Sequence, residues 1–122
     1  MKTAHDPRHQ LRRDTVKLLF AESHTHQKNL NEQAKNVLKV GSELDGIIEK
    51  AATEWPIDRL NKIDLAILRL AVYELTHSDT PPKVVIDEAV ELAKEYGAES
   101  SSSFVNGVLG TILKDLNKEK QS

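Results

Sequence analysis

The segment over residues 58–76 constrains the fold more than any other part of the chain. Its apolar residues recur at helical spacing, and they fall on nearly every face of the helix instead of on one stripe. A helix that is apolar all round belongs at the centre of a bundle, because other elements must cover each of its faces. These residues are Leu60, Ile63, Leu65, Ile67, Leu68, Leu70, Val72 and Leu75.

Four further segments have the one-sided apolar period of helices that cover such a core. Pro7 and Pro82 suit first helical turns, and Trp55-Pro56 ends a helix because the residue before proline disfavours the α region. Gly97 stands where a C′ glycine commonly ends a helix. The expected helices besides the central one span about 7–22, 31–54, 82–96 and 102–117.

These segments predict an all-α fold, a compact helical bundle of about five to six helices. A single domain over residues 1–122 is expected, with frayed ends at 1–6 and 118–122. In the helix over 31–54, an inward stripe is expected at positions three and four apart. Its members are Val37, Gly41, Leu44, Ile48, Ala51 and Trp55.

The composition favours a cytoplasmic protein that folds without disulfides or structural metal ions. Of the 122 residues 39% are hydrophobic and 30% charged, which is enough for one buried core. The absence of cysteine excludes disulfides and thiolate metal sites and suits a reducing compartment. No apolar run approaches the roughly 20 residues that cross a bilayer, and no secretory leader is evident, so no membrane partner is expected.

Residues suited to catalysis are present but lack the required spacing. The pair His24 and His26 lies in a polar loop with no third ligand at helical spacing, so we expect no metal. The serines at 100–103 precede an apolar helical segment, where capping is a simpler role than that of a nucleophile. We therefore predict no catalytic residues, no cofactor and no enzyme activity.

The charge is distributed unevenly along the chain. Residues 1–17 carry a net charge of +3, whereas the whole chain carries −2 and the remainder therefore −5. Arg8 and Arg12, like Arg13 and Lys17, are four residues apart and stand side by side on a helix. A phosphate partner would explain such like-charged pairs, but so would a solvated face with carboxylates nearby, and the residues alone do not separate the two interpretations. Arg69, almost alone in the central apolar helix, is expected to pair with Glu88 or Glu91.

Four strings in order resemble the NusB family of bacterial transcription antitermination factors. They are RHQLRRDTVKLLF, WPIDRLNKIDLAILRLAVYEL, PPKVVIDEAVELAKEYGAE and FVNGVLG, and the resemblance runs from about Arg8 to Leu116. It implies a protein that pairs with the small-subunit ribosomal protein NusE and binds boxA-type single-stranded RNA in ribosomal RNA leaders. Other Nus factors and RNA polymerase would be indirect partners, and the outcome would be processive transcription.

The resemblance also implies which positions meet RNA and which meet NusE. Tyr96 and Phe104 match aromatic positions on which a base could stack, although both could instead close the core. Phe20 and Asp64 match positions that face the ribosomal partner. The full set expected to bind RNA is Arg8, His9, Arg12, Arg13, Lys17, Lys83, Tyr96, Ser100 and Phe104.

The chain departs from the family pattern between its first and second long helices. Relatives usually have a longer segment there that includes a helix, whereas here about a dozen residues fill the gap. A homodimer is possible, but this shortened segment puts any homodimer surface formed there in doubt. Two rival functions are a helical protein–protein adaptor without direct RNA binding and an RNA methyltransferase. The methyltransferase would need a second, glycine-rich domain, for which 122 residues leave no room.

Overall fold

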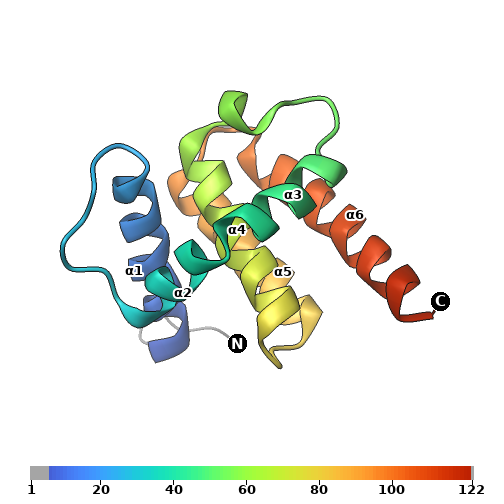
Figure 1. Ribbon diagram of the computed structural model, residues 1–122, viewed down its shortest axis with the longest axis horizontal. Helices are drawn as coiled ribbons and strands as arrows, with labels where there is room; N and C mark the ends of the chain where they lie inside the picture. The colour runs from blue at the N-terminus through green and yellow to red at the C-terminus, as the bar shows by residue number, and fades with distance from the viewer. Residues whose placement is uncertain (1–5, 122) are drawn as a thin grey trace.

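The computed structural model describes residues 6–121, which form six α-helices and one 3-10 turn and contain no strand (Figure 1). The all-α prediction is confirmed, and the helices predicted over 7–22 and 82–96 have the expected bounds. Within the described residues, no helix is both long and apolar enough to span a bilayer. The elements are α1 (Pro7–Glu22), α2 (Glu32–Lys39), α3 (Gly41–Ala51), η1 (Ile57–Arg59), α4 (Lys62–His77), α5 (Pro82–Tyr96) and α6 (Ser101–Gln121).

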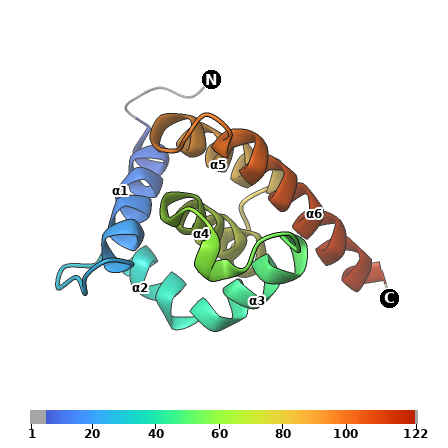
Figure 2. The same ribbon diagram turned by 90° about the horizontal axis from the view of Figure 1, so that it is seen from above.

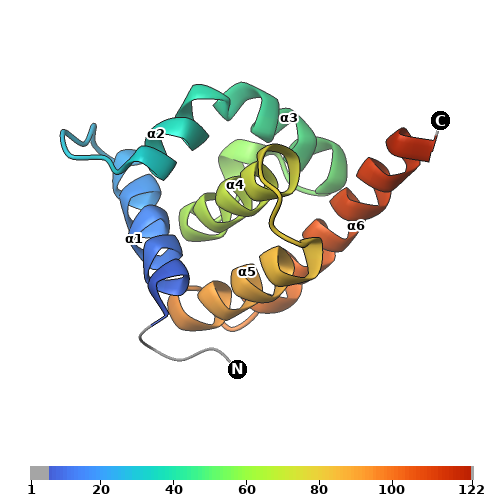
Figure 3. The ribbon, with the colours of Figure 1, turned by 90° about the horizontal axis from the view of Figure 1, so that it is seen from below.

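Helix α4 lies at the centre, and the other helices surround it. Viewed along its axis, α1, α2, α3, α6 and α5 form a ring around α4 (Figure 2), and the opposite view shows the same arrangement (Figure 3). All five of these helices contact α4. The apolar residues of α4 are buried on several faces, including Leu65, Ile67, Leu68 and Val72. The predicted central helix is therefore confirmed, and its burial supplies much of the hydrophobic stabilisation.

Short polar side chains define where several helices begin. Asp6 Oδ1 accepts a hydrogen bond from the Arg8 backbone N–H at 2.9 Å, with Pro7 in the first turn of α1. That bond lowers the pKa of Asp6, because it stabilises the carboxylate. Asn31 caps α2 by accepting from the Ala34 N–H at 2.8 Å. These caps satisfy backbone donors that a helix leaves unpaired.

The single helix predicted over 31–54 is instead two helices, α2 and α3, separated at Val40. Val40 has φ −109° and ψ 22°, outside the helical region, and Gly41 starts the next helix. An unbroken helix over this span would be about 36 Å long and would meet α4 only along part of that length. The bend lets Val37 and Ile48 both be fully buried, so tertiary packing outweighs local periodicity here.

Three smaller differences concern the ends of helices and the inward stripe. The central helix begins at Lys62, after the separate turn η1, and not at residue 58. Trp55 was expected to face inward but is 53% exposed, because the chain leaves the helical path after Ala51. The last helix continues to Gln121, beyond the expected end at 117. Residues 1–5 and 122, where fraying was expected, lie outside the described residues.

Candidate nucleic-acid interface

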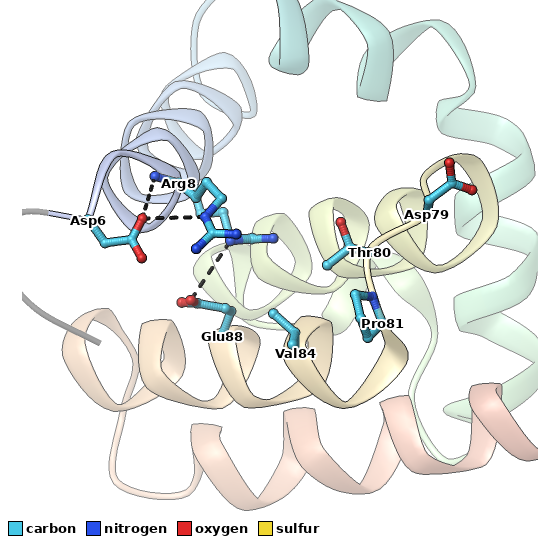
Figure 4. Close-up of a pocket in the computed structure, with 8 residues that line it drawn as sticks. Asp6, Arg8, Asp79, Thr80, Pro81, Val84 and Glu88 are labelled. Carbon is cyan, nitrogen blue, oxygen red and sulfur yellow. Dashed lines mark hydrogen bonds and ion pairs between the residues drawn. The ribbon is translucent and has the colours of Figure 1, made fainter. Parts of the chain in front are cut away.

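Arg8 and Lys83 lie near the starts of α1 and α5. Both side chains are exposed, and Asp6 Oδ1 lies 3.6 Å from Arg8 Nε. Arg8 lies beside a hollow of about 620 Å³ between α1, the α4–α5 loop and the start of α5, and Figure 4 shows the residues around it. The hollow is lined by Asp6, Arg8, Arg12, Asp79, Thr80, Pro81, Val84 and Glu88.

His9 and Arg12 point inward, which differs from the exposed basic row expected for them. Arg12 is 7% exposed and donates two hydrogen bonds to Glu74 from one edge of its guanidinium, at 2.9 Å from Nε and 2.7 Å from Nη2. His9 Nδ1 donates to Glu88 Oε2 at 2.7 Å, and Glu88 Oε1 lies 3.8 Å from Arg12 Nη1. The bond to Glu74 raises the pKa of Arg12. A cation placed in this way has its charge matched inside the fold, because a buried charge must be paired.

Arg13 and Lys17 reach from α1 toward the C-terminal half of α5. Arg13 Nη2 lies 2.9 Å from Glu95 Oε1 in a partly exposed ion pair. The exposed Lys17 ammonium lies 5.6 Å from the centre of the Tyr96 ring, within range of a cation–π interaction. Tyr96 itself is half-buried against the core, so it contributes to both packing and surface.

Ser100 and Phe104 line a second hollow, at the end of the bundle where α4 and α6 begin. This hollow measures about 530 Å³, and Asp64 lies in its wall. Trp55 also borders it, although the sequence placed Trp55 in the core. Helix α3 ends at Ala51, so the helical spacing that placed Trp55 inward no longer applies at that residue. The lining residues are Trp55, Arg59, Leu60, Asn61, Asp64, Ser100, Ser103 and Phe104.

The two residues expected to face NusE have different environments. Asp64 is 7% exposed, and its Oδ1 has no hydrogen-bond partner among the described residues. Burial raises the pKa of Asp64, and the nearby Ser101 hydroxyl offsets this only in part. Phe20 is 37% exposed at the end of α1, where the edge of its ring meets His24 at a centroid separation of 4.7 Å.

Other polar groups serve the fold. Arg69 binds Asp45 of α3 with Nε and Nη2, both at 2.8 Å, so the expected pairing with Glu88 or Glu91 is wrong. The error arose because Arg69 faces α3, whereas Glu88 and Glu91 belong to α5, which packs on another side of α4 (Figure 2). Across residues 6–121, no three His, Asp or Glu side chains gather in a way that could hold a metal ion.

The candidate interface therefore has two exposed parts, with the buried ion pairs of His9 and Arg12 between them. Arg8 and Lys83 lie at one end of the α1–α5 pair, and Lys17 and Tyr96 lie toward the other. Exposed cations beside aromatic rings suit a phosphate backbone and unstacked bases.

Comparison with known proteins gives the family. The model of the NusB family matches residues 2–114. This chain belongs to the NusB family. It is 54% identical over 81 residues to a transcription antitermination protein NusB of Acetivibrio thermocellus, and that alignment covers 66% of this chain and 56% of the relative. The aligned part of the NusB-family chain thus spans little more than half the length of that relative.

Solved structures agree with the family along most of the chain. A NusB of T. maritima is 34% identical, with a TM-score of 0.78 and coverage of 93% of each chain. A chain from a crystal structure of the antitermination factors NusB and NusE in complex with dsRNA is 29% identical, with a TM-score of 0.72. That match covers 90% of this chain and 99% of the other. The NusB-like fold expected from the sequence is confirmed.

Proposed function

We propose that this chain is a transcription antitermination factor that pairs with NusE and binds boxA-type single-stranded RNA in ribosomal RNA leaders. The observation that carries the proposal is its similarity, over 90% of its length, to a chain from a solved complex of NusB and NusE with dsRNA. Its role is binding, without catalysis or a cofactor, and acting on nascent transcripts places it in the cytoplasm. Other Nus factors and RNA polymerase are indirect partners.

The distribution of charge supports a joint mechanism. The net charge of −2 gives no broad positive surface, and Arg12 and Arg13 already bind carboxylates. A few exposed cations and one or two rings bind RNA weakly on their own. A basic ribosomal protein docked beside them would extend the positive surface, so affinity and selectivity belong to the pair.

A gel-shift series tests the proposal. A boxA-like RNA is titrated with this chain alone, with NusE alone and with both together. We expect weak shifts with either protein and a strong, sequence-dependent shift with both. Complex formation with NusE but no RNA shift would favour the adaptor function, and no complex with either molecule would contradict both.

A further inference from the structure

We propose that Glu74 and Glu88 are positioning residues for RNA binding: two buried carboxylates hold α1 so that its exposed cations face RNA together with the residues of α5. This inference rests on the proposed function and deepens it. Simple charge complementarity predicts that carboxylates weaken binding of an anion such as RNA. The inference instead makes two carboxylates essential for that binding.

The contact between α1 and α5 consists chiefly of long polar side chains. Helix α1 packs against α4 and α2, whereas it reaches α5 through the ends of long side chains. These links are His9 to Glu88, Arg12 to Glu88, Arg13 to Glu95 and Lys17 to the Tyr96 ring. The first two are buried and the last two reach solvent. The buried pair of links therefore sets where α1 sits relative to α5.

Glu74 and Glu88 come from different helices and hold the same segment of α1. Glu74 of α4 is 5% exposed and binds Arg12 with both oxygens, which fixes the direction of the guanidinium plane. Glu88 of α5 is also 5% exposed and bonds to His9, one turn earlier on α1. Two attachment points from two helices fix both the position of α1 and its rotation about its own axis.

That rotation determines where the exposed cations of α1 point. Arg8 is adjacent to His9, so turning His9 away from Glu88 would also turn Arg8 away from the start of α5, where Lys83 lies. Lys17 would in the same way lose its place over Tyr96. Arg12 acts through this arrangement, since its Nε and Nη2 atoms are bound to Glu74, its Nη1 atom lies 3.8 Å from Glu88, and the residue is only 7% exposed in the wall of the hollow beside Arg8.

The test measures RNA affinity of the chain–NusE pair for a boxA-like RNA over a range of salt concentrations. The variants are Glu74→Gln and Glu88→Gln. Glu91→Gln is the control, since Glu91 is an exposed acid of the same helix, α5, and lies beside α6 instead of α1. We expect each buried variant to bind roughly tenfold more weakly, within the range by which residues remote from a ligand alter affinity. Removing the exposed charge should leave affinity unchanged or slightly tighter. Circular dichroism at the assay temperature confirms that each variant is folded.

The slope of log affinity against log salt separates positioning from direct contact. Loss of one phosphate contact reduces the slope by about 0.7 for single-stranded RNA, so Arg8→Gln should lower it by that amount. Arg12→Gln and Arg12→Lys should both weaken binding with the slope unchanged, because a lysine cannot form the two-point bond to Glu74. If Arg12→Lys keeps full affinity while Arg12→Gln loses slope, Arg12 contacts RNA directly and the proposal is wrong.

Two further outcomes would also overturn it. Folded Glu74→Gln and Glu88→Gln variants that bind RNA as tightly as the unaltered pair would show that α1 needs no such anchor. Failure of the unaltered pair to bind RNA would contradict the proposed function itself. That result is seen before any substitution is made, so it is distinguished from a failure of the inference about Glu74 and Glu88.

Discussion

At the residue scale, neighbouring arginines of one helix have different roles that the sequence does not separate. Arg8 and Arg12 are one helical turn apart, yet one is exposed and the other is 7% exposed and bound to Glu74. The four-residue spacing correctly places them side by side. Which of the two is buried depends on a carboxylate 62 positions away, so only the tertiary structure decides it.

Asp64 provides a residue-scale prediction in which stability and partner binding change in opposite directions. Its pKa is raised above the ordinary 3.8 by burial, so the unfolded chain releases this proton at lower pH than the folded chain does. The free energy of unfolding therefore falls as pH rises through that window, and the penalty is fully present at neutral pH. Asp64→Asn should raise the free energy of unfolding at pH 7 by about 1 kcal/mol, because it removes a buried charge with an unpaired oxygen.

Urea unfolding of both proteins at pH 7 and at pH 3 checks this expectation. The gain should shrink at the lower pH, where Asp64 is protonated in both states. If Asp64 faces NusE, as the family resemblance implies, the same variant should bind NusE more weakly. Equal stability of the two proteins at every pH would contradict the assigned environment of Asp64.

At the element scale, the sequence predicted the bounds of the helices that begin at a proline better than those of the other helices. The helices over 7–22 and 82–96 have proline starts, and the bounds of both were predicted correctly. The segment over 31–54 has a continuous stripe, but it must follow the curved outside of α4, and periodicity carries no information about that curvature. Trp55 was misplaced for the same reason, since the stripe was extended past the end of α3.

Two glycines at different places in their elements give an element-scale prediction. Gly46 lies within α3, and a methyl group there would meet nothing within 4 Å, so Gly46→Ala should raise the free energy of unfolding by about 0.5–1 kcal/mol. At Gly97, between α5 and α6, a Cβ would lie 2.5 Å from Ser101 Cβ and 2.7 Å from the Ala93 carbonyl oxygen. Gly97→Ala should therefore lower the free energy of unfolding by about 1–3 kcal/mol through overpacking.

The same substitution thus has opposite signs at two positions, and each variant is a control for the other. Both are measured by urea unfolding with helicity as the signal. Gly97 has φ −89°, so its requirement is the close approach of Ser101 and not a left-handed backbone. A stabilising Gly97→Ala would show that the α5–α6 junction is looser than this contact indicates.

At the scale of the whole molecule, the proposed function depends on cations that the fold leaves exposed. The sequence shows five cations within residues 1–17, but it does not show which carboxylates the fold brings to them. Glu74, Glu88 and Glu95 come from two other helices and engage His9, Arg12 and Arg13. The family and fold could be predicted from linear strings, whereas the electrostatics of the site depend on contacts far apart in the chain.

The salt dependence of RNA binding tests this reduced count of available cations. Arg8, Lys17 and Lys83 are exposed at the candidate interface, and about 0.7 of slope for each phosphate contact gives a slope near −2 for the chain alone. If all six cationic positions expected from the sequence, His9 included, met phosphates, the slope would approach about −4.

Adding NusE should both tighten binding and steepen the slope, because its cations contribute further contacts. Fluorescence anisotropy with a boxA-like RNA at several salt concentrations, with and without NusE, measures both slopes. A slope near −4 for the chain alone would mean that RNA displaces the internal carboxylates from Arg12 and Arg13. If NusE tightens binding but leaves the slope unchanged, NusE orders this surface without touching the RNA backbone.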